Sequence, residues 1–298
     1  MTILCFMKLS SKANFYLILA TLMWGITFPL VRNALTEVDP FVFVSLRFTL
    51  AALVSLTMVW AFFHKTTRLM LGGSLIIAVF NTVAYLCQTI GLETVNSARA
   101  AFITGTSVIF VPFLVPLFKL GKLTRLDIIC ALIGLAGLYV LTDIRHLHVV
   151  AGDIWVFISA LAFSFQITYL QRLTQTVENY KLITFYQLFF SAIFVSLFAG
   201  GHEFRTALQP QAMIGILFCA IFATSLAYYW QNKYQKFSSA PKAALIFALE
   251  PVFASLFGFL INRELLSRAT VYGGLLLLFS LILPSVMTIV RASTVSIR

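Results

Sequence analysis

Glu250 stands in a part of the sequence where an ionised group is costly. It is the only charged residue in the apolar run 243–261, which is long enough to cross a bilayer as a helix. Near the middle of a membrane an ionised side chain costs about 2.5–3.5 kcal/mol on insertion scales. The position indicates a carboxylate that binds a proton or a cationic substrate group, or that pairs with an arginine. The structural alternative is that Glu250 pins its helix to the neighbouring helices.

Two stripes of polar side chains occur in other apolar runs. In each stripe three residues are spaced i, i+4 and i+7, so they share one face of a helix. The stripes are Asn81, Tyr85 and Gln88, and Thr224, Tyr228 and Gln231. Such groups either line a cavity or hydrogen-bond between helices, where each bond contributes only about 0.6 kcal/mol on average. We favour cavity lining, with Gln88 and Gln231 near opposite ends of the pathway.

Arg47 and several prolines also lie inside apolar runs. Arg47 is about two turns from the start of its run, and a long cationic side chain can extend to the membrane surface. We therefore expect Arg47 to be an anchor rather than a direct ligand. Pro29, Pro112 and Pro251 each remove a backbone donor and free a carbonyl. They are candidate hinges or substrate-coordinating breaks, and fixed kinks are the alternative.

The composition indicates the elements that position these residues. The chain is 60% hydrophobic and 10% charged, with a mean hydropathy of +0.97, whereas soluble domains are about 25% charged. Because the apolar runs are continuous, they favour helices over a barrel. We expect an all-α polytopic membrane protein with ten transmembrane helices and no soluble domain. The expected spans are 14–34, 41–63, 70–91, 97–118, 126–142, 152–171, 182–200, 211–231, 241–262 and 269–290.

The cations are distributed unevenly between the two sides of these spans. Of the 21 lysines and arginines, fourteen fall on the side of the N-terminus, six on the other side, and Arg47 inside a span. Under the positive-inside rule this bias predicts that both termini are cytoplasmic. The net charge of +11 is thus a topology signal, and we expect no nucleic-acid partner.

The two halves of the sequence align at an offset of 143 residues. Tyr85 then matches Tyr228, and five spans fall on five spans. Because five is odd, the second half enters the membrane from the opposite side. We therefore expect two inverted repeats, 14–142 with spans 1–5 and 152–290 with spans 6–10, an organisation typical of secondary transporters. An old duplication without mechanical meaning is the alternative. Glu250 is matched by Ser107, so the scaffold is duplicated and the charge is not.

Several short motifs, in order along the chain, resemble the drug/metabolite transporter superfamily, EamA type. The resemblance covers about residues 14–290. The motifs are Trp24-Gly25-Ile26-Thr27-Phe28-Pro29, Asp39-Pro40, Leu46-Arg47-Phe48, Gly91-Leu92-Glu93, Ala98-Arg99-Ala100-Ala101-Phe102, Val111-Pro112, Gly152-Asp153, Glu250-Pro251 and Arg263-Glu264. Phe163-Ser164 departs from the family pattern, which often has a second tryptophan in the sixth span.

The resemblance implies ten helices around a central cavity lined mainly by spans 1, 3, 4, 6, 8 and 9. Aromatic side chains in that cavity would suit a flat or cationic substrate. Combined with the polar stripes, this predicts a set of substrate-binding or cavity residues. They are Trp24, Phe28, Asn81, Tyr85, Gln88, Thr104, Ser107, Tyr169, Tyr228, Gln231, Phe247 and Glu250.

The resemblance also implies transport of small metabolites across a cell membrane of the bacterial inner type. We expect a secondary transporter that works by alternating access, exporting amino acids, amines or related compounds, with proton coupling left open. Uptake or exchange of a larger nucleoside-like metabolite is the alternative, and a passive channel or membrane enzyme is a more distant one. The partners are the lipid bilayer and a small-molecule substrate, as a monomer or a dimer.

No cofactor or metal site is expected. The cysteines Cys5, Cys87, Cys130 and Cys219 lack metal-ligand spacing, and the four histidines fall in predicted loops. Without a constellation of acid, base or metal ligands, we do not expect an enzyme. No P-loop is present, so we do not expect ATP-driven transport either.

Overall fold

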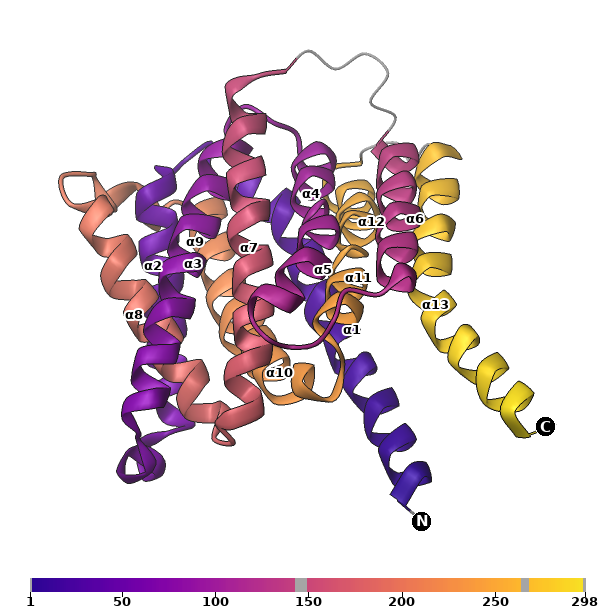
Figure 1. Cartoon of the computed structure of the whole chain (residues 1–298). Helices are drawn as coiled ribbons and strands as arrows, with labels where there is room; N and C mark the ends of the chain where they lie inside the picture. The colour runs from indigo at the N-terminus through magenta and orange to yellow at the C-terminus, as the bar shows by residue number, and fades with distance from the viewer. Residues whose placement is uncertain (1, 143–148, 264–267, 297–298) are drawn as a thin grey trace.

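The computed structural model describes residues 2–142, 149–263 and 268–296, and these form helices joined by short loops (Figure 1). The first half consists of α1 (Thr2–Ala34), α2 (Pro40–Thr57), η1 (Trp60–Lys65), α3 (Arg68–Leu92), α4 (Ser97–Gly105), α5 (Ser107–Leu117) and α6 (Arg125–Thr142). The second half consists of α7 (Ala151–Thr176), α8 (Tyr180–Ala199), η3 (Phe204–Leu208), α9 (Pro210–Phe218), η4 (Cys219–Leu226), α10 (Ala227–Tyr234), η5 (Gln235–Phe237), α11 (Ala240–Phe247), α12 (Glu250–Asn262) and α13 (Arg268–Ser296).

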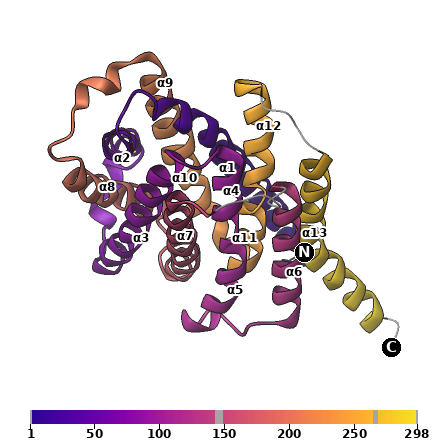
Figure 2. The same ribbon diagram turned by 90° about the horizontal axis from the view of Figure 1, so that it is seen from above.

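The ten expected spans all correspond to helical segments of the described chain. Eight segments are long and apolar enough to cross a membrane, and Arg268–Pro284 is a shorter apolar helix. The remaining segment is α6, which corresponds to the fifth expected span; it has 18 residues and packs along α13 (Figure 2). The start of α1 and the end of α13 lie at the same end of the bundle (Figure 1). Which end is cytoplasmic stays a prediction.

The expected end of the second span at residue 63 is wrong. The α-helix ends at Thr57, and Trp60–Lys65 forms the separate 3₁₀ turn η1. Trp60 is 75% exposed, and the ammonium group of Lys65 lies 5.8 Å from the centre of the Phe62 ring. This mixture of aromatic and cationic side chains is typical of the membrane–water interface, so apolar residues there do not extend the span.

The helices of the two halves interleave. The span containing α9, η4 and α10 packs against α1, and α3 packs against α7. At the 143-residue offset α1 corresponds to α7, and α3 corresponds to the span of α9, η4 and α10, so each of these two contacts is the equivalent of the other. The same exchange relates the packing of α1 on α12 to that of α7 on α4 and α5. Figure 2 shows α2 beside α8 at one side of the bundle and α6 beside α13 at the other. This pattern supports the proposal of two related repeats.

Spans 4 and 9 are broken at positions that correspond at the 143-residue offset. The first break falls at Thr106, between α4 and α5, and the second at Ala248 and Leu249, between α11 and α12. Pro251 follows the second break and leaves the carbonyl of Phe247 without a helical donor. In contrast, Pro112 and Pro29 lie inside α5 and α1, which continue through them.

Side-chain caps fix where several helices begin. Asp39 precedes α2, and its carboxylate accepts from the backbone N–H of Phe41 at 2.8 Å. Asn96 caps α4 and Ser239 caps α11, each accepting from the backbone N–H three residues later. Asn96 and Ser239 are themselves 143 residues apart, so both broken spans start in the same way.

Candidate functional site

A cavity of about 40 Å³ lies where the two broken spans meet α1, α2, α3, α7 and α10. This volume is enough for ordered water. Its lining mixes aromatic, polar and charged side chains. The lining residues are Trp24, Thr27, Arg47, Tyr85, Gln88, Thr104, Gly105, Ser107, Phe163, Gln166, Ile167, Tyr228, Gln231, Phe247 and Glu250.

Arg47 projects from α2 into this cavity and is only 2% exposed. Its Nε donates to Thr224 Oγ1 at 2.8 Å, and its guanidinium carbon lies 4.5 Å from the centre of the Tyr85 ring. Its Nη2 is buried and has no hydrogen-bond partner among the described residues. The expectation that Arg47 extends to the membrane surface is therefore wrong, because α2 packs against η4 and α3 at this position.

Glu250 is the first residue of α12 and also lines the cavity. The N-terminus of a helix carries a partial positive charge that favours an anion. Gly25 of α1 packs so closely here that a Cβ added to it would lie 3.1 Å from the Glu250 carbonyl oxygen. Within the described chain no ion pair joins Glu250 to Arg47. The cavity therefore holds a guanidinium group and a carboxyl group that are not paired by direct contact.

Tyr85 and Tyr228, which correspond at the 143-residue offset, meet at the cavity wall. The Tyr228 hydroxyl lies 3.2 Å from the Tyr85 hydroxyl and 3.1 Å from Asn81 Oδ1. The ring of Trp24 lies 5.9 Å from that of Tyr228, centre to centre. Residues of the two polar stripes thus both line the cavity and form hydrogen bonds between helices.

The Tyr228 hydroxyl is expected to matter more for stability than the Tyr85 hydroxyl. Tyr228→Phe leaves Asn81 Oδ1 buried without this donor, a loss of about 1–3 kcal/mol. Tyr85→Phe keeps the Tyr228–Asn81 bond and is the matched control. Thermal unfolding of the purified protein should give a lower midpoint for Tyr228→Phe than for Tyr85→Phe. Equal midpoints would show that the bond to Asn81 contributes nothing.

The glutamines of the two stripes lie in different surroundings. Gln88 Nε2 donates to Thr104 Oγ1 at 3.1 Å, linking α3 to α4. Gln231 Nε2 donates to Gln235 Oε1 at 3.0 Å and also faces Gln166 of α7 at 3.4 Å. Their assignment to opposite gates stays a prediction.

Span 8 contains a π-helical segment, η4, that the sequence did not reveal. A π-helix shifts the backbone bonding pattern and is often found at functional sites. Here Trp24 Nε1 donates to the carbonyl of Ala223 at 2.8 Å, and Thr224 accepts from Arg47. The segment therefore orients one aromatic and one cationic side chain of the cavity.

Nine of the twelve predicted cavity residues line the cavity, and three do not. Phe28 is buried in the packing between helices, and Asn81 accepts a hydrogen bond from the Tyr228 hydroxyl. Tyr169 stacks edge-on with Phe118, away from the cavity lining. The stripe spacing identifies a helix face but not how deep each member lies.

Thr27, Gly105, Phe163, Gln166 and Ile167 line the cavity without having been predicted. Those on α7 carried a usable signal, because positions 163, 166 and 167 are spaced i, i+3 and i+4 and share one helix face. The sequence stripe was overlooked because two of its members are apolar.

Comparison with known proteins identifies the family of this chain. The model of the EamA-like transporter family matches residues 11–143 and again 150–286. The chain belongs to the EamA-like transporter family. It is accordingly a transporter and a multi-pass membrane protein, with the bilayer and a small molecule as its partners.

The relatives are similar over nearly their whole length. An uncharacterized transporter of Archaeoglobus fulgidus is 30% identical over 92% of this chain and 85% of its own. The uncharacterized transporter YvbV of Bacillus subtilis is 26% identical over 93% of each. A solved crystal structure at 17% identity has a TM-score of 0.73 over 93% of this chain and 97% of its own, and shows the shared fold.

Proposed function

We propose that this EamA-family protein carries small amino compounds by alternating access, with zwitterionic amino acids as the preferred substrates. The observation that carries the proposal is the cavity that contains Arg47 and Glu250 without an ion pair between them. Export is the direction proposed for a cell that accumulates the substrate, because concentration gradients set the net direction of a secondary transporter.

The two charges fit the two ends of an amino acid. A buried charge without a partner costs several kcal/mol, and the free Nη2 of Arg47 can donate to a carboxylate. Glu250, from a different span, can accept from an ammonium group. A zwitterion would provide a partner for both, whereas an amine or a carboxylic acid would leave one of them without a partner.

The remaining walls suit the uncharged part of such a substrate. Trp24, Phe163 and Phe247 contribute aromatic surface to the cavity, and aromatic faces also attract an ammonium group. The volume of about 40 Å³ is far below the roughly 300–1,000 Å³ of pockets that hold small molecules. The described conformation therefore fits a closed intermediate that must open to admit substrate.

The duplicated scaffold supports alternating access. The proposed repeats, 14–142 and 152–290, lie close to the two segments matched by the family model, 11–143 and 150–286. The breaks in spans 4 and 9 correspond between the halves. Discontinuous helices beside a central site, in two inverted repeats, are the recurring organisation of secondary transporters.

Counterflow in proteoliposomes tests the substrate class. Vesicles are loaded with an unlabelled compound, and the same compound in labelled form is added outside. Four compounds are compared: an amino acid, its decarboxylated amine, its deaminated acid and a nucleoside. We expect saturable counterflow that is strongest for the amino acid, and Glu250→Gln should reduce its advantage over the deaminated acid. Stronger counterflow of the nucleoside would favour the alternative substrate, and flux that does not saturate would indicate a channel.

A further inference from the structure

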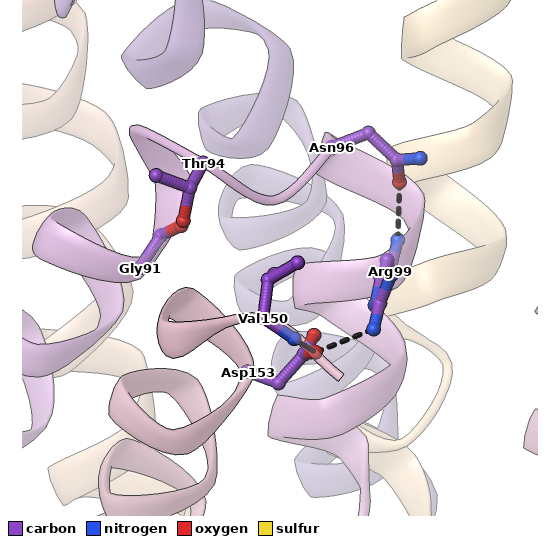
Figure 3. Close-up of polar contacts among 6 residues, drawn as sticks. All are labelled: Gly91, Thr94, Asn96, Arg99, Val150 and Asp153. Atoms are coloured by element: carbon purple, nitrogen blue, oxygen red, sulfur yellow. Dashed lines mark hydrogen bonds and ion pairs between the residues drawn. The ribbon is translucent and has the colours of Figure 1, made fainter. Parts of the chain in front are cut away.

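An ion pair between Arg99 and Asp153 joins the two halves at the end of the bundle opposite the termini (Figure 1). Arg99 of α4 contacts Asp153 of α7 through Nη2 and Oδ2, and their side chains are 13% and 12% exposed (Figure 3). The same Asp153 oxygen accepts from the backbone N–H of Val150 at 2.8 Å, at the start of α7. Asn96 holds the first turn of α4 by accepting from the Arg99 backbone N–H at 2.8 Å.

Beside this ion pair, α3 and α7 touch through their backbones. A Cβ added to Gly152 would lie 2.2 Å from Thr94 Oγ1 and 2.7 Å from the Gly91 carbonyl oxygen. A Cβ added to Gly91 would lie 2.8 Å from the Gly152 carbonyl oxygen. The seam formed by Gly91, Thr94 and Gly152 thus leaves no space between the helices, and the ion pair closes its edge.

The corresponding positions at the other end cannot form such a pair. At the 143-residue offset Arg99 matches Lys242 and Asp153 matches Ser10. The cation is retained, and so is its helix cap, because Ser239 replaces Asn96. However, α1 contains no aspartate or glutamate from Thr2 to Ala34. The capped helix start and its cation are therefore repeated at the other end, whereas the acid is not, and neither are the seam glycines, because Gly91 matches Tyr234 and Gly152 matches Leu9.

We propose that Arg99 and Asp153 are gating residues, a latch that favours closure of the cavity at the end away from the termini. The proposal rests on the alternating access proposed above. Opening this end separates α4 and α3 from α7, so it breaks the ion pair and the glycine seam together. Because an interaction shifts an equilibrium only by its difference between the two states, a pair present at one end biases the protein towards the state that is closed there.

Accessibility of a single cysteine in the cavity tests the latch without any substrate. Ser107→Cys in a chain with its own four cysteines replaced is labelled by a membrane-impermeant thiol reagent from either face of oriented vesicles. We expect Asp153→Asn to raise the labelling rate from the latch face about five-fold, the lower end of the usual range for coupled sites. Arg99→Gln should also raise the labelling rate, and the double variant should raise it by less than the two single effects combined, because both single variants remove the contact between Arg99 and Asp153.

Asp127→Asn is the matched control. Asp127 is also the third residue of its helix, and its carboxylate accepts from the Thr124 backbone N–H at 3.1 Å, as Asp153 does from Val150. No arginine contact to Asp127 occurs among the ion pairs of the described chain. Labelling in this variant should equal that of the parent. An equal rise in both variants, or none in Asp153→Asn, would overturn the latch.

A crosslink keeps the test decisive if the charge variants fold poorly. Thr94→Cys with Val156→Cys places one thiol on each side of the seam and keeps both glycines. Joining the two thiols with a short cleavable bis-thiol reagent should abolish labelling of the cavity from the latch face until the reagent is cleaved. Labelling that continues after crosslinking would refute this seam as the gate. These readouts do not depend on counterflow, so a wrong substrate class would leave them unchanged.

Discussion

Replacing Arg47 with glutamine is expected to weaken amino-acid binding about 100-fold while leaving the empty protein at least as stable. Losing one partner of a buried, hydrogen-bonded charge pair costs about 2–5 kcal/mol, and each 1.4 kcal/mol is about ten-fold in Kd. In the empty protein the same guanidinium is buried with Nη2 unpartnered. Removing this buried charge relieves its desolvation cost, which offsets the loss of the hydrogen bond to Thr224.

The two measurements separate a ligand from an anchor. Binding is followed by the ligand-induced rise in unfolding midpoint, which depends on affinity by mass action, and the stability of the empty protein is followed by the midpoint alone. Arg172→Gln, at an exposed arginine, is the control for loss of a positive charge. An Arg47→Gln protein that melts lower yet still responds to amino acids would show that Arg47 is a structural anchor.

The sequence predicted the spans and the polar stripes well, and the physical reason is direct. Continuous apolar runs must become helices in a bilayer, and the spacing of Tyr85 and Gln88 fixes them to one helix face. The 143-residue offset pairs Tyr85 with Tyr228, and in the structure the two hydroxyl groups lie at hydrogen-bond distance. The hydropathy pattern and the residue spacing therefore predict the helices and the face that each helix turns to the cavity.

Other features of the site depend on tertiary packing and could not be predicted. The direction of Arg47 is decided by the neighbours of α2, and a helix rotation of a few tens of degrees would send the same residue outward. The π-helical segment around Thr224 leaves no mark in hydropathy. Asn81 shares the stripe of Tyr85, but it accepts a hydrogen bond from Tyr228 and is not part of the cavity lining.

The pair α6 and α13 permits a comparison of neighbouring glycines with opposite expected effects. Gly137 of α6 lies against the backbone of α13 near Gly273. A Cβ added to Gly273 would lie 2.3 Å from the Leu141 amide nitrogen and 2.5 Å from the Gly137 carbonyl oxygen. These are backbone atoms, so no side-chain rotation relieves the clash.

Gly273→Ala is therefore expected to lower stability by about 1–3 kcal/mol, the usual cost of overpacking. At Gly274 the nearest atom to an added Cβ is Val252 Cγ2 at 3.5 Å, which is ordinary contact. Gly274→Ala should instead stabilise by up to about 1 kcal/mol, because alanine favours the helix over glycine. Thermal midpoints measured under one set of detergent conditions should fall for the first variant and rise for the second. If both midpoints rose, α6 and α13 would be packed less closely than their backbones are here, and the glycine contact would not hold the two spans together.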